Sequence, residues 1–354
     1  MGLLFHDGFG VADHQTAEEV TALLYSRHPE WDVKFGPKGR KACADDVYNT
    51  LLYLATATAT ERYDLFREYL SWLRRLLAQI NIAPRHLADM LVAMRDALAG
   101  RGMNPDSPEL TFLDDGISDL ASLGAETGSL PFAETHRADL ASELFSLLHR
   151  GDRGTATTSV LNWAETLGVE GVYLDVIEPC LQEIGRRWHD NQLNVAEEHF
   201  MTASIQVVMA RLYPLVFQAS RIGRRLVAVC AEGELHEIGM RMVADLFDIG
   251  GWDTTFLGAG VPDTAVIRTI RDRGCDLLAI SASLAINVPA VTRLVSALRL
   301  DPQCSHVKVM VGGRAFNQSP DLWRRTGADG WAGGGREALR TGNRLFEATA
   351  EPVS

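Results

Sequence analysis

The last 130 residues alternate short apolar runs with amphipathic segments, and this alternation constrains the fold more than any other feature of the chain. Strand candidates lie at 226–230, 253–257, 277–281 and 307–311, and helical patterns lie at 238–249, 263–273, 288–299 and from Arg336 onward. Strands that alternate with helices predict a parallel, doubly wound sheet. Ligands bind such sheets at the carboxyl ends of the strands.

The rest of the chain has helical periodicity, so we predict an α/β domain joined to all-α regions. Turn signals at 35–41 and 81–84 separate the first helices, and Gly, Pro, Ser and Asp become frequent after Gly100. Four amphipathic segments precede the first strand, which indicates a small bundle. The predicted parts are an N-terminal helical module (1–104), a linker (105–135), a four-helix bundle (136–220) and the α/β domain (221–354).

Composition restricts the compartment and the partners. No apolar run is long enough to cross a membrane, and the N-terminus lacks the basic and apolar regions of a secretory signal, so we expect a cytoplasmic protein without a membrane partner. The five cysteines form no CxxC pair, which predicts reduced and mostly buried thiols. A net charge of −12 disfavours direct binding to nucleic acid.

Unusual residues follow the predicted strands, where a ligand is expected. Glu234-Leu-His-Glu-Ile-Gly239 follows the first strand, Ser281-Ala-Ser283 the third, and Gly312-Gly313 the fourth. A neutral imidazole on a loop is a good ligand for cobalt, and a carboxylate two residues earlier can hold its other nitrogen. His236 is therefore the candidate metal ligand. The alternative is a loop histidine that caps a helix, with glycines that only make turns.

These motifs resemble the cobalamin-binding domain shared by methionine synthase, corrinoid methyl carriers, mutases and CarH-type photoreceptors. The family pattern is Asp-x-His-x-x-Gly, then Ser-x-Leu, then Gly-Gly, so Glu234 and Ser283 depart from it. The glutamate form resembles the photoreceptor branch more than the methyl carriers. The resemblance implies a Rossmann-like domain in which His236 is the lower axial cobalt ligand. It implies these cofactor-binding residues: Glu234, His236, Glu237, Gly239, Leu257, Gly258, Val261, Ser281, Ser283, Gly312 and Gly313.

Within this set, the resemblance assigns separate tasks. Gly239 lets the nucleotide tail of the cofactor pass close to the backbone, and Gly312 and Gly313 leave room for its base. Ser281 could donate a hydrogen bond to that tail or join the His236 relay.

A second constellation lies in the predicted bundle. Trp188-His189 is followed by Glu198-His199, which places nine residues between the Trp and the Glu-His pair. This spacing resembles the cap of CarH-type receptors, which implies that Trp188 packs on the adenosyl group of adenosylcobalamin and that Glu198 and His199 line the same pocket. His189 matches a position that binds the upper face of cobalt after light expels adenosine. The alternative places Trp188 in the bundle core and both histidines on the surface.

The N-terminal module carries no net positive charge, because residues 1–105 hold 12 Lys or Arg and 13 Asp or Glu. The module is rich in aromatic residues, and aromatic residues at helical spacing more often form a core than a pigment-binding site. Nevertheless the layout resembles the photocobilin group, which implies a bound linear tetrapyrrole such as biliverdin. The candidates are Lys34, Lys38, Arg40 and Lys41 for its propionates, His28, His86 or Asp45 for its pyrroles, and Cys43 for covalent attachment or as a buried small residue.

Two functions follow from these resemblances. The first is a light sensor without enzyme activity, in which photolysis of adenosylcobalamin, coupled to any bound bilin, changes contact with an unknown protein effector or within a homo-oligomer such as a dimer. The alternative is a corrinoid methyl carrier that serves a separate methyltransferase. A mutase is disfavoured because no domain of barrel size is present to enclose a substrate.

Overall fold

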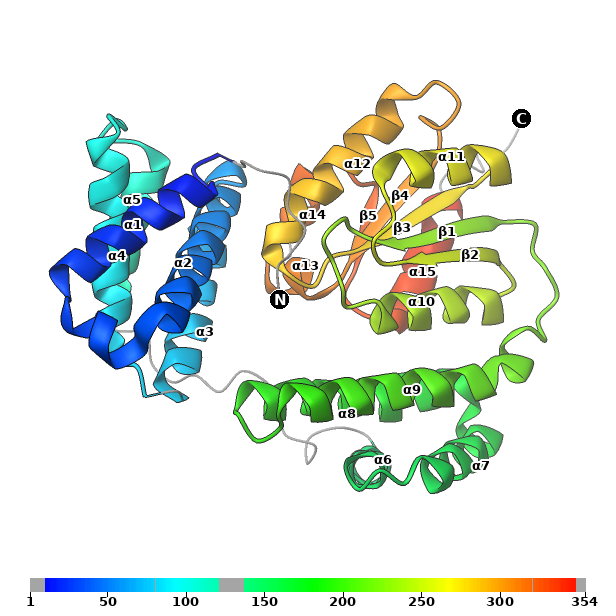
Figure 1. Ribbon diagram of the computed structural model, residues 1–354. Coiled ribbons are helices and arrows are strands. Elements are labelled where there is room, and N and C mark those ends of the chain that lie inside the picture. The colour runs from blue at the N-terminus through cyan, green and yellow to red at the C-terminus, as the bar shows by residue number, and fades with distance from the viewer. Residues whose placement is uncertain (1–9, 80, 121–136, 320, 348–354) are drawn as a thin grey trace. The chain divides into compact units, whose positions relative to one another are not determined.

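A computed structural model describes residues 10–79, 81–120, 137–319 and 321–347 of the 354-residue chain (Figure 1). The chain divides into two compact units, residues 1–127 and 128–354. The bundle and the α/β domain, which the sequence separates, belong to the same second unit. No helix among the described residues is both long enough and apolar enough to span a bilayer.

The first unit consists of helices, as its periodicity predicts. Its interior is formed by aliphatic and aromatic side chains, among which Leu54, Phe66 and Leu91 are fully buried. The sharp turn predicted at 35–41 is a kink at Gly36, where φ is 60°, and the chain remains helical on both sides of it. The helices are α1 (His14–Arg27), α2 (Glu30–Ala59), α3 (Tyr63–Gln79), α4 (Pro84–Gly100) and α5 (Pro108–Asp119).

Helix α5 corrects the predicted linker, which was expected to run from 105 to 135. Ser107 caps α5 by accepting a hydrogen bond from the Leu110 N–H, and Pro108 occupies the first turn. The residues that suggested a flexible linker therefore begin a helix. Leu113 is fully buried on the inner face of α5. The rest of the predicted linker, residues 121–136, lies outside the described residues.

The second unit begins with the predicted four-helix bundle. Its helices are α6 (Ala138–His149), α7 (Arg153–Val172), α8 (Glu178–His189) and α9 (Val195–Val216), and a π-helical segment, η2 (Tyr173–Ile177), connects α7 to α8. Apolar residues from all four helices form one core, with Leu148, Val160, Cys180 and Met209 at its centre. The residues between α8 and α9 form a tight turn, in which Asn191 has a φ of 55°.

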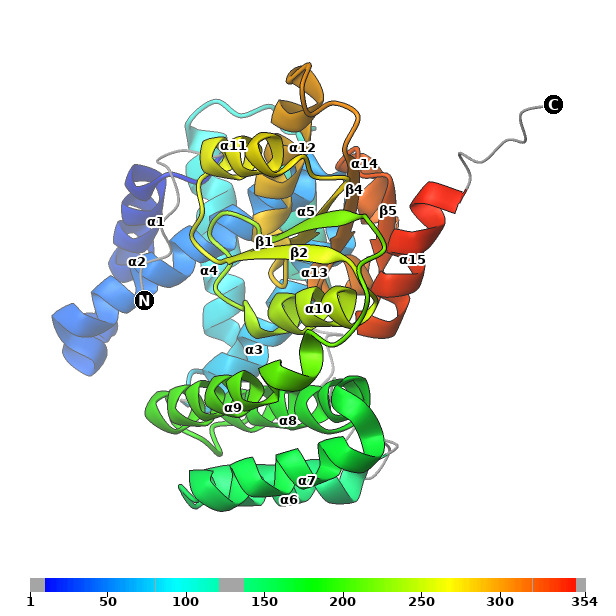
Figure 2. The same cartoon turned by 90° about the vertical axis from the view of Figure 1, so that its right-hand side faces the viewer.

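The α/β domain contains five parallel strands in the order β2-β1-β3-β4-β5. Helices α10 and α15 cover one face and α11 and α12 cover the other, as Figures 1 and 2 show. The predicted doubly wound fold is confirmed. The elements are β1 (Arg225–Cys230), α10 (Ile238–Ile249), β2 (Asp253–Gly258), α11 (Asp263–Arg273), β3 (Leu277–Ser281), η3 (Ala285–Asn287), α12 (Val288–Leu300), β4 (Lys308–Gly312), α13 (Arg314–Gln318), α14 (Leu322–Arg325), β5 (Gly330–Ala332) and α15 (Gly335–Glu347).

The bundle packs against the α10 side of the sheet, which Figure 2 shows from the end. Tyr173 donates a 2.8 Å hydrogen bond from its hydroxyl to Asp245 Oδ2, and both residues are buried. The Arg241 guanidinium donates to the Tyr213 hydroxyl at 3.1 Å. These polar contacts, made inside an apolar interface, fix the orientation of the bundle on the sheet.

Candidate functional site

The three predicted motifs meet at one edge of the sheet because the strands end in register. Cys230 at the end of β1 pairs with Ser281 at the end of β3, and Ser281 pairs with Gly312 at the end of β4. The loops that leave these strands therefore begin side by side. The strand order reverses between β1 and β3, and this is the place where open parallel sheets leave a crevice for ligands.

A single buried carboxylate joins the first two loops. Glu234 has no exposed surface, although it lies in a loop. One of its oxygens serves its own loop and the other reaches the loop that follows β3. Oε1 accepts from Leu235 N (3.0 Å), His236 N (2.9 Å) and His236 Nδ1 (2.5 Å), and Oε2 accepts from Ser283 N (2.6 Å), Leu284 N (3.2 Å) and Asn287 Nδ2 (3.0 Å).

These hydrogen bonds set the protonation state of the pair. Burial alone would raise the pKa of Glu234, but the hydrogen bonds and charge of His236 and the backbone N–H groups lower it to about 2. The bond to Glu234 in turn raises the pKa of His236. Because Nδ1 is held by the carboxylate, Nε2 is left as the free nitrogen of a side chain that is 63% exposed. The predicted hydrogen bond between Glu234 and His236 is present, and it leaves Nε2 available on an exposed side chain.

Glu237 connects the relay loop to two further elements. Its Oε2 accepts from the Ala259 N–H at 3.2 Å, beyond the end of β2, and its Oε1 lies 3.4 Å from the Gln206 amide nitrogen on α9. Gly258 has a φ of 73°, and a Cβ there would lie 2.8 Å from Glu237 Oε2. Gly258 is therefore required for this contact. Of the other predicted residues, Leu257 near the end of β2 and Val261 in the loop after it are both half-buried.

The glycines of the site differ in what they do. Gly313 has a φ of 99°, and a Cβ there would lie 2.5 Å from the Ala282 carbonyl oxygen. At Gly312 a Cβ would lie 3.1 Å from the Ala332 carbonyl oxygen. The backbone itself therefore requires a glycine at 313 whatever the ligand, whereas at 312 a Cβ would make a tight contact. Gly239 differs, because it lies in the first turn of α10 and a Cβ there would meet nothing within 4 Å.

The bundle places its own predicted residues at one end. Trp188 is in the last turn of α8 and Glu198 in the first turn of α9, so the nine intervening residues are mainly the turn between two packed helices. The charge of Glu198 acts on His236 and raises its pKa, which places the start of α9 near the relay. Trp188 is 41% exposed and therefore does not belong to the bundle core. His199 lies 2.5 Å from Glu198 Oε2 and is 62% exposed.

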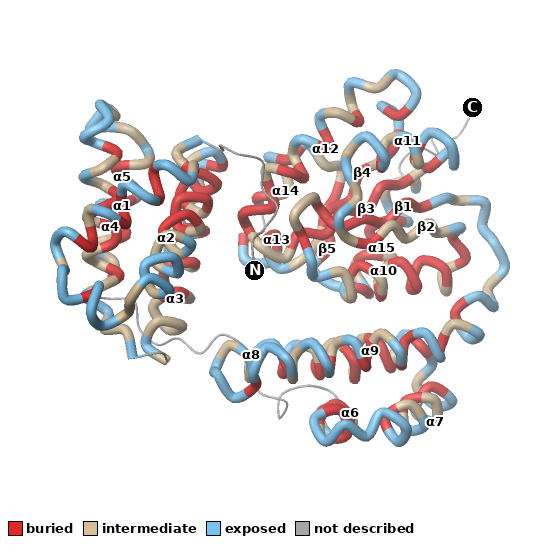
Figure 3. Tube along the Cα trace, viewed as in Figure 1, coloured by how far each residue is buried: buried red, intermediate tan, exposed pale blue. Residues whose placement is uncertain are grey.

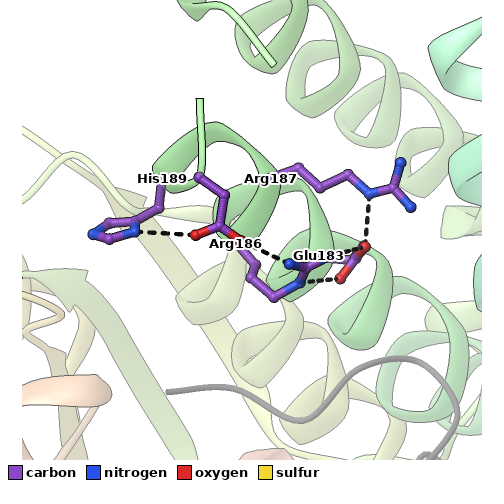
Figure 4. A network of polar contacts seen from close by, with 5 residues as sticks. Glu183, Arg186, Arg187 and His189 are labelled. Atoms are coloured by element: carbon purple, nitrogen blue, oxygen red, sulfur yellow. Dashed lines mark hydrogen bonds and ion pairs between the residues drawn. The ribbon is translucent and has the colours of Figure 1, made fainter. Parts of the chain in front are cut away.

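A buried carboxylate stabilises the end of α8. Glu183 is 5% exposed and lies between the guanidinium groups of Arg186 and Arg187, which donate to it at 2.7 Å (Figure 4). Burial opposes ionisation, but these hydrogen bonds lower the pKa of Glu183. His189 points away from this cluster, with Nδ1 at 3.6 Å from Asp190 Oδ1.

Some hydrogen-bond donors to Glu234 were not predicted from the sequence. Ser281 is buried, but the loop after β3 contacts Glu234 through the backbone N–H groups of Ser283 and Leu284 instead of through the Ser281 hydroxyl. Asn287 is fully buried and supplies the remaining donor. The sequence shows only an asparagine directly before the helix predicted at 288–299, and nothing in it indicates the pairing with Glu234.

The first unit holds the residues predicted for a bilin. His28 stacks on Trp31 with ring centroids 4.3 Å apart, and its two nitrogens lie near Glu30 and Asp89. Arg40 lies 3.4 Å from Asp32. The basic residues Lys34, Lys38, Arg40 and Lys41 are exposed. Burial raises the pKa of the Cys43 thiol to about 11. His86 packs edge-on against Trp31, and Asp45 is exposed.

Comparison with known proteins now identifies the α/β domain. Residues 224–341 match the family described as B12 binding domain, and residues 140–213 match a second family of the same description. This chain carries a B12-binding domain. The match to residues 140–213 falls on the bundle, so both parts of the second unit resemble B12-binding families.

Corrinoid proteins are among the relatives of this chain. A corrinoid protein of Desulfitobacterium hafniense is 22% identical over 47% of this chain and 78% of its own length. Dimethylamine corrinoid protein 3 of Methanosarcina mazei is 27% identical over 41% of this chain and 85% of its own length. The structure of the monomethylamine corrinoid protein of Methanosarcina barkeri has the same fold, with a TM-score of 0.52 at 19% identity over 59% of this chain and 99% of that one.

The residues of the B12-binding domain fit a corrinoid. The imidazole of His236 is held by a buried carboxylate and directs its free nitrogen outward, which is the arrangement expected of a metal-ligating histidine. Gly239 leaves open space where the local backbone does not require a glycine. A cofactor tail that passes close to α10 would explain that glycine.

Proposed function

We propose that this chain is a corrinoid methyl carrier that serves a separate methyltransferase and is not itself an enzyme. The Glu234–His236 relay is the observation that supports the cobalamin ligand, and the named relatives support the carrier role because they are corrinoid proteins. Bound cobalamin would supply an alkyl–cobalt bond whose alkyl group can pass to an acceptor or be released by light. The carrier's own task is to hold and shield that cofactor.

The residues divide this task. Glu234 holds the proton of His236 on Nδ1, so that Nε2 remains a ligand of fixed orientation. Glu237 and Gln206 join the relay loop to α9, and Glu198 places a negative charge on the same side. The end of the bundle would therefore cover the upper face of the cofactor and exclude water from it. A partner methyltransferase would have to displace this cover to reach the cofactor.

The ligand can be tested by electron paramagnetic resonance of the chain labelled with ¹⁵N-histidine and reconstituted with cob(II)alamin. We expect a doublet splitting from one ¹⁵N imidazole nitrogen, and we expect His236→Ala to lose this doublet. The nitrogen of the cofactor's own base is unlabelled and would give a triplet. His306→Ala is the matched control, because His306 is an exposed histidine of the same domain outside the relay. A His236→Ala spectrum that keeps the ¹⁵N doublet would refute the assignment.

Light sensing with adenosylcobalamin is the second candidate, and the exposure of Trp188 favours it. An aromatic ring 41% exposed at the end of the bundle can pack against a large upper ligand. In this proposal His189, in the same turn, would bind the upper face of the cofactor after illumination. His28, His86, Lys34, Lys38, Arg40, Lys41, Asp45 and Cys43 would be the residues available to biliverdin in the first unit.

Binding titrations separate the two functions. A carrier should bind methylcobalamin at least as tightly as adenosylcobalamin, and Trp188→Ala should change neither affinity by more than about threefold. A sensor should prefer adenosylcobalamin, lose that preference in Trp188→Ala, and give a stable light product whose absorption changes in His189→Ala. Addition of biliverdin before illumination tests the bilin, because a bound bilin would shift its own absorption band.

A further inference from the structure

Helix α9 has an exposed apolar stripe that lies outside both the bundle core and the contact with the sheet. Its side chains recur at alternating spacings of four and three residues, and all are exposed, including Phe200 at 40% and Val207 at 53%. Figure 3 shows exposed positions recurring along α9. Surface apolar residues usually occur singly, so a continuous row needs an explanation. The α9 stripe consists of Ala196, Phe200, Ala203, Val207, Ala210 and Pro214.

The α9 stripe is a third face of its helix. Ile205, Met209 and Leu212 point into the bundle core. Gln206 and Tyr213 meet Glu237 and Arg241 of the B12-binding domain. The stripe residues lie on the opposite side of α9 from the core residues, next to the side that carries Gln206 and Tyr213. The bundle core is therefore formed without them, although the Arg153 guanidinium lies 5.6 Å from the centroid of the Phe200 ring.

The spacing of the stripe is that of a helix that packs along another helix. Alternating steps of four and three give a repeat of 3.5 residues, which keeps the row facing a partner crossed at about 20°. Alanine recurs at 196, 203 and 210, so two backbones can approach closely at every second step. With 22 residues, α9 provides a straight surface roughly 33 Å long.

Charge and symmetry indicate what covers it. Glu197 and Arg211 flank the same side of the stripe near its opposite ends. In an antiparallel pair related by a two-fold axis, Ala203 of one copy meets Val207 of the other, and each Glu197 faces the Arg211 of the second copy. In a parallel pair the flanks that carry Glu197 and Arg211 would lie on opposite sides of the interface, so neither residue would face the other. Within the described part of the chain Arg211 forms no ion pair or hydrogen bond.

The first unit is a poorer match for this surface. Among its described residues, the one large apolar side chain that is strongly exposed is Val33. The described residues of the first unit therefore offer no apolar row to cover the α9 stripe. A second copy offers the same row with complementary charges. We propose that the chain forms a two-fold symmetric dimer in which the α9 stripes of two copies pack antiparallel.

Sedimentation analysis of the full chain tests the dimer. We expect the intact chain to have twice its 38.9 kDa mass at micromolar concentration, with or without cobalamin. Val207→Glu places a charge in the stripe and should give monomers. Leu300→Glu is the matched control, because Leu300 is 83% exposed at the end of α12 and should leave the dimer intact. Monomeric wild-type protein at about 100 μM would overturn the proposal.

Arg211→Glu keeps the test valid if Val207→Glu fails to fold, which circular dichroism would show. The variant leaves the apolar row intact but places an acidic side chain opposite Glu197 of the other copy, once at each end of the interface. Because like charges repel, the dissociation constant of the dimer should rise by roughly tenfold or more at low salt. An unchanged dissociation constant would refute the antiparallel arrangement.

Crosslinking tests the direction of packing independently. In a Cys43→Ser background, Ala203→Cys and Val207→Cys variants are prepared separately and then mixed with a short thiol crosslinker. An antiparallel pair should crosslink mainly between the two variants. Crosslinks mainly within each variant would overturn the proposal.

Discussion

Replacing Glu234 with glutamine tests the physical basis of the site. The amide keeps the size of the side chain but replaces one acceptor oxygen by an NH₂ group. Each carboxylate oxygen of Glu234 receives three N–H donors, so either orientation of the amide sets an NH₂ group against three donors. Because the position has no exposed surface, water cannot replace the lost acceptor.

The expected loss can be worked out in two ways. Three hydrogen bonds at about 1 kcal/mol each give roughly 3 kcal/mol. The pKa of Glu234 falls from 4.5 to about 2, and at 1.36 kcal/mol per pKa unit this also gives roughly 3 kcal/mol. Since the folded-state pKa is depressed, the contribution is complete above pH 4.5 and is lost as the pH falls through 2.

Urea denaturation of the protein without cobalamin at pH 7, followed by circular dichroism, measures this loss. Glu234→Gln should lower the free energy of unfolding of the second unit by roughly 3 kcal/mol. Glu232→Gln makes the same chemical change in the same loop, where Glu232 forms a partly exposed ion pair with Arg293, and should lower it by less than about 1 kcal/mol. If the two variants were equally stable, the buried carboxylate would not have the role assigned to it.

Three further substitutions probe other parts of the fold. Burial raises the pKa of Asp245 to about 6, so the protonated Asp245 stabilises the fold below pH 3.8, and this stabilisation is lost as the pH rises through 6. Asp245→Asn should therefore raise the free energy of unfolding, measured in urea, by up to about 3 kcal/mol at pH 8 and by little at pH 4. Gly313→Ala should lower the melting temperature in calorimetry, because its Cβ would clash with the Ala282 carbonyl and φ is positive; Gly334→Ala, where a Cβ meets nothing within 4 Å, is the control. Glu183→Gln should lower stability by roughly 1–3 kcal/mol in urea at pH 7 by removing one acceptor from two arginines, and a variant as stable as wild type would contradict this role.

The sheet could be predicted because its strands are buried on both faces. Residues 277–281 and 226–230 are almost wholly apolar, and each lies between helical patterns of regular length. Strand β5 has only three residues and lies at the edge of the sheet, so its sequence contains no apolar run that would predict a strand. Helix α5 was missed for the opposite reason, since its serine cap and first-turn proline are the residues that also make loops.

The candidate site could be predicted where its contacts are local in sequence. Glu234 and His236 are two residues apart, so their pairing follows from the motif itself. Asn287 lies 53 residues beyond Glu234, and its contact depends on which strands are neighbours. At Gly312 and Gly313 the structure adds a reason for glycine that the sequence did not indicate, since a neighbouring backbone carbonyl lies close to where a Cβ would be. The room that they would leave for the base of a cofactor stays a prediction.

The departure from the family pattern at position 234 has a structural reason. Glutamate is one methylene longer than aspartate, and here one oxygen serves the β1 loop while the other reaches the β3 loop. Both oxygens are fully used, so the direction of the His236 ring depends on two strand ends rather than on one flexible loop. A lower ligand held in this way is the same for a methyl carrier and for a light sensor. The difference between the two functions must therefore lie on the bundle side, where Trp188 and Glu198 end one helix and begin the next.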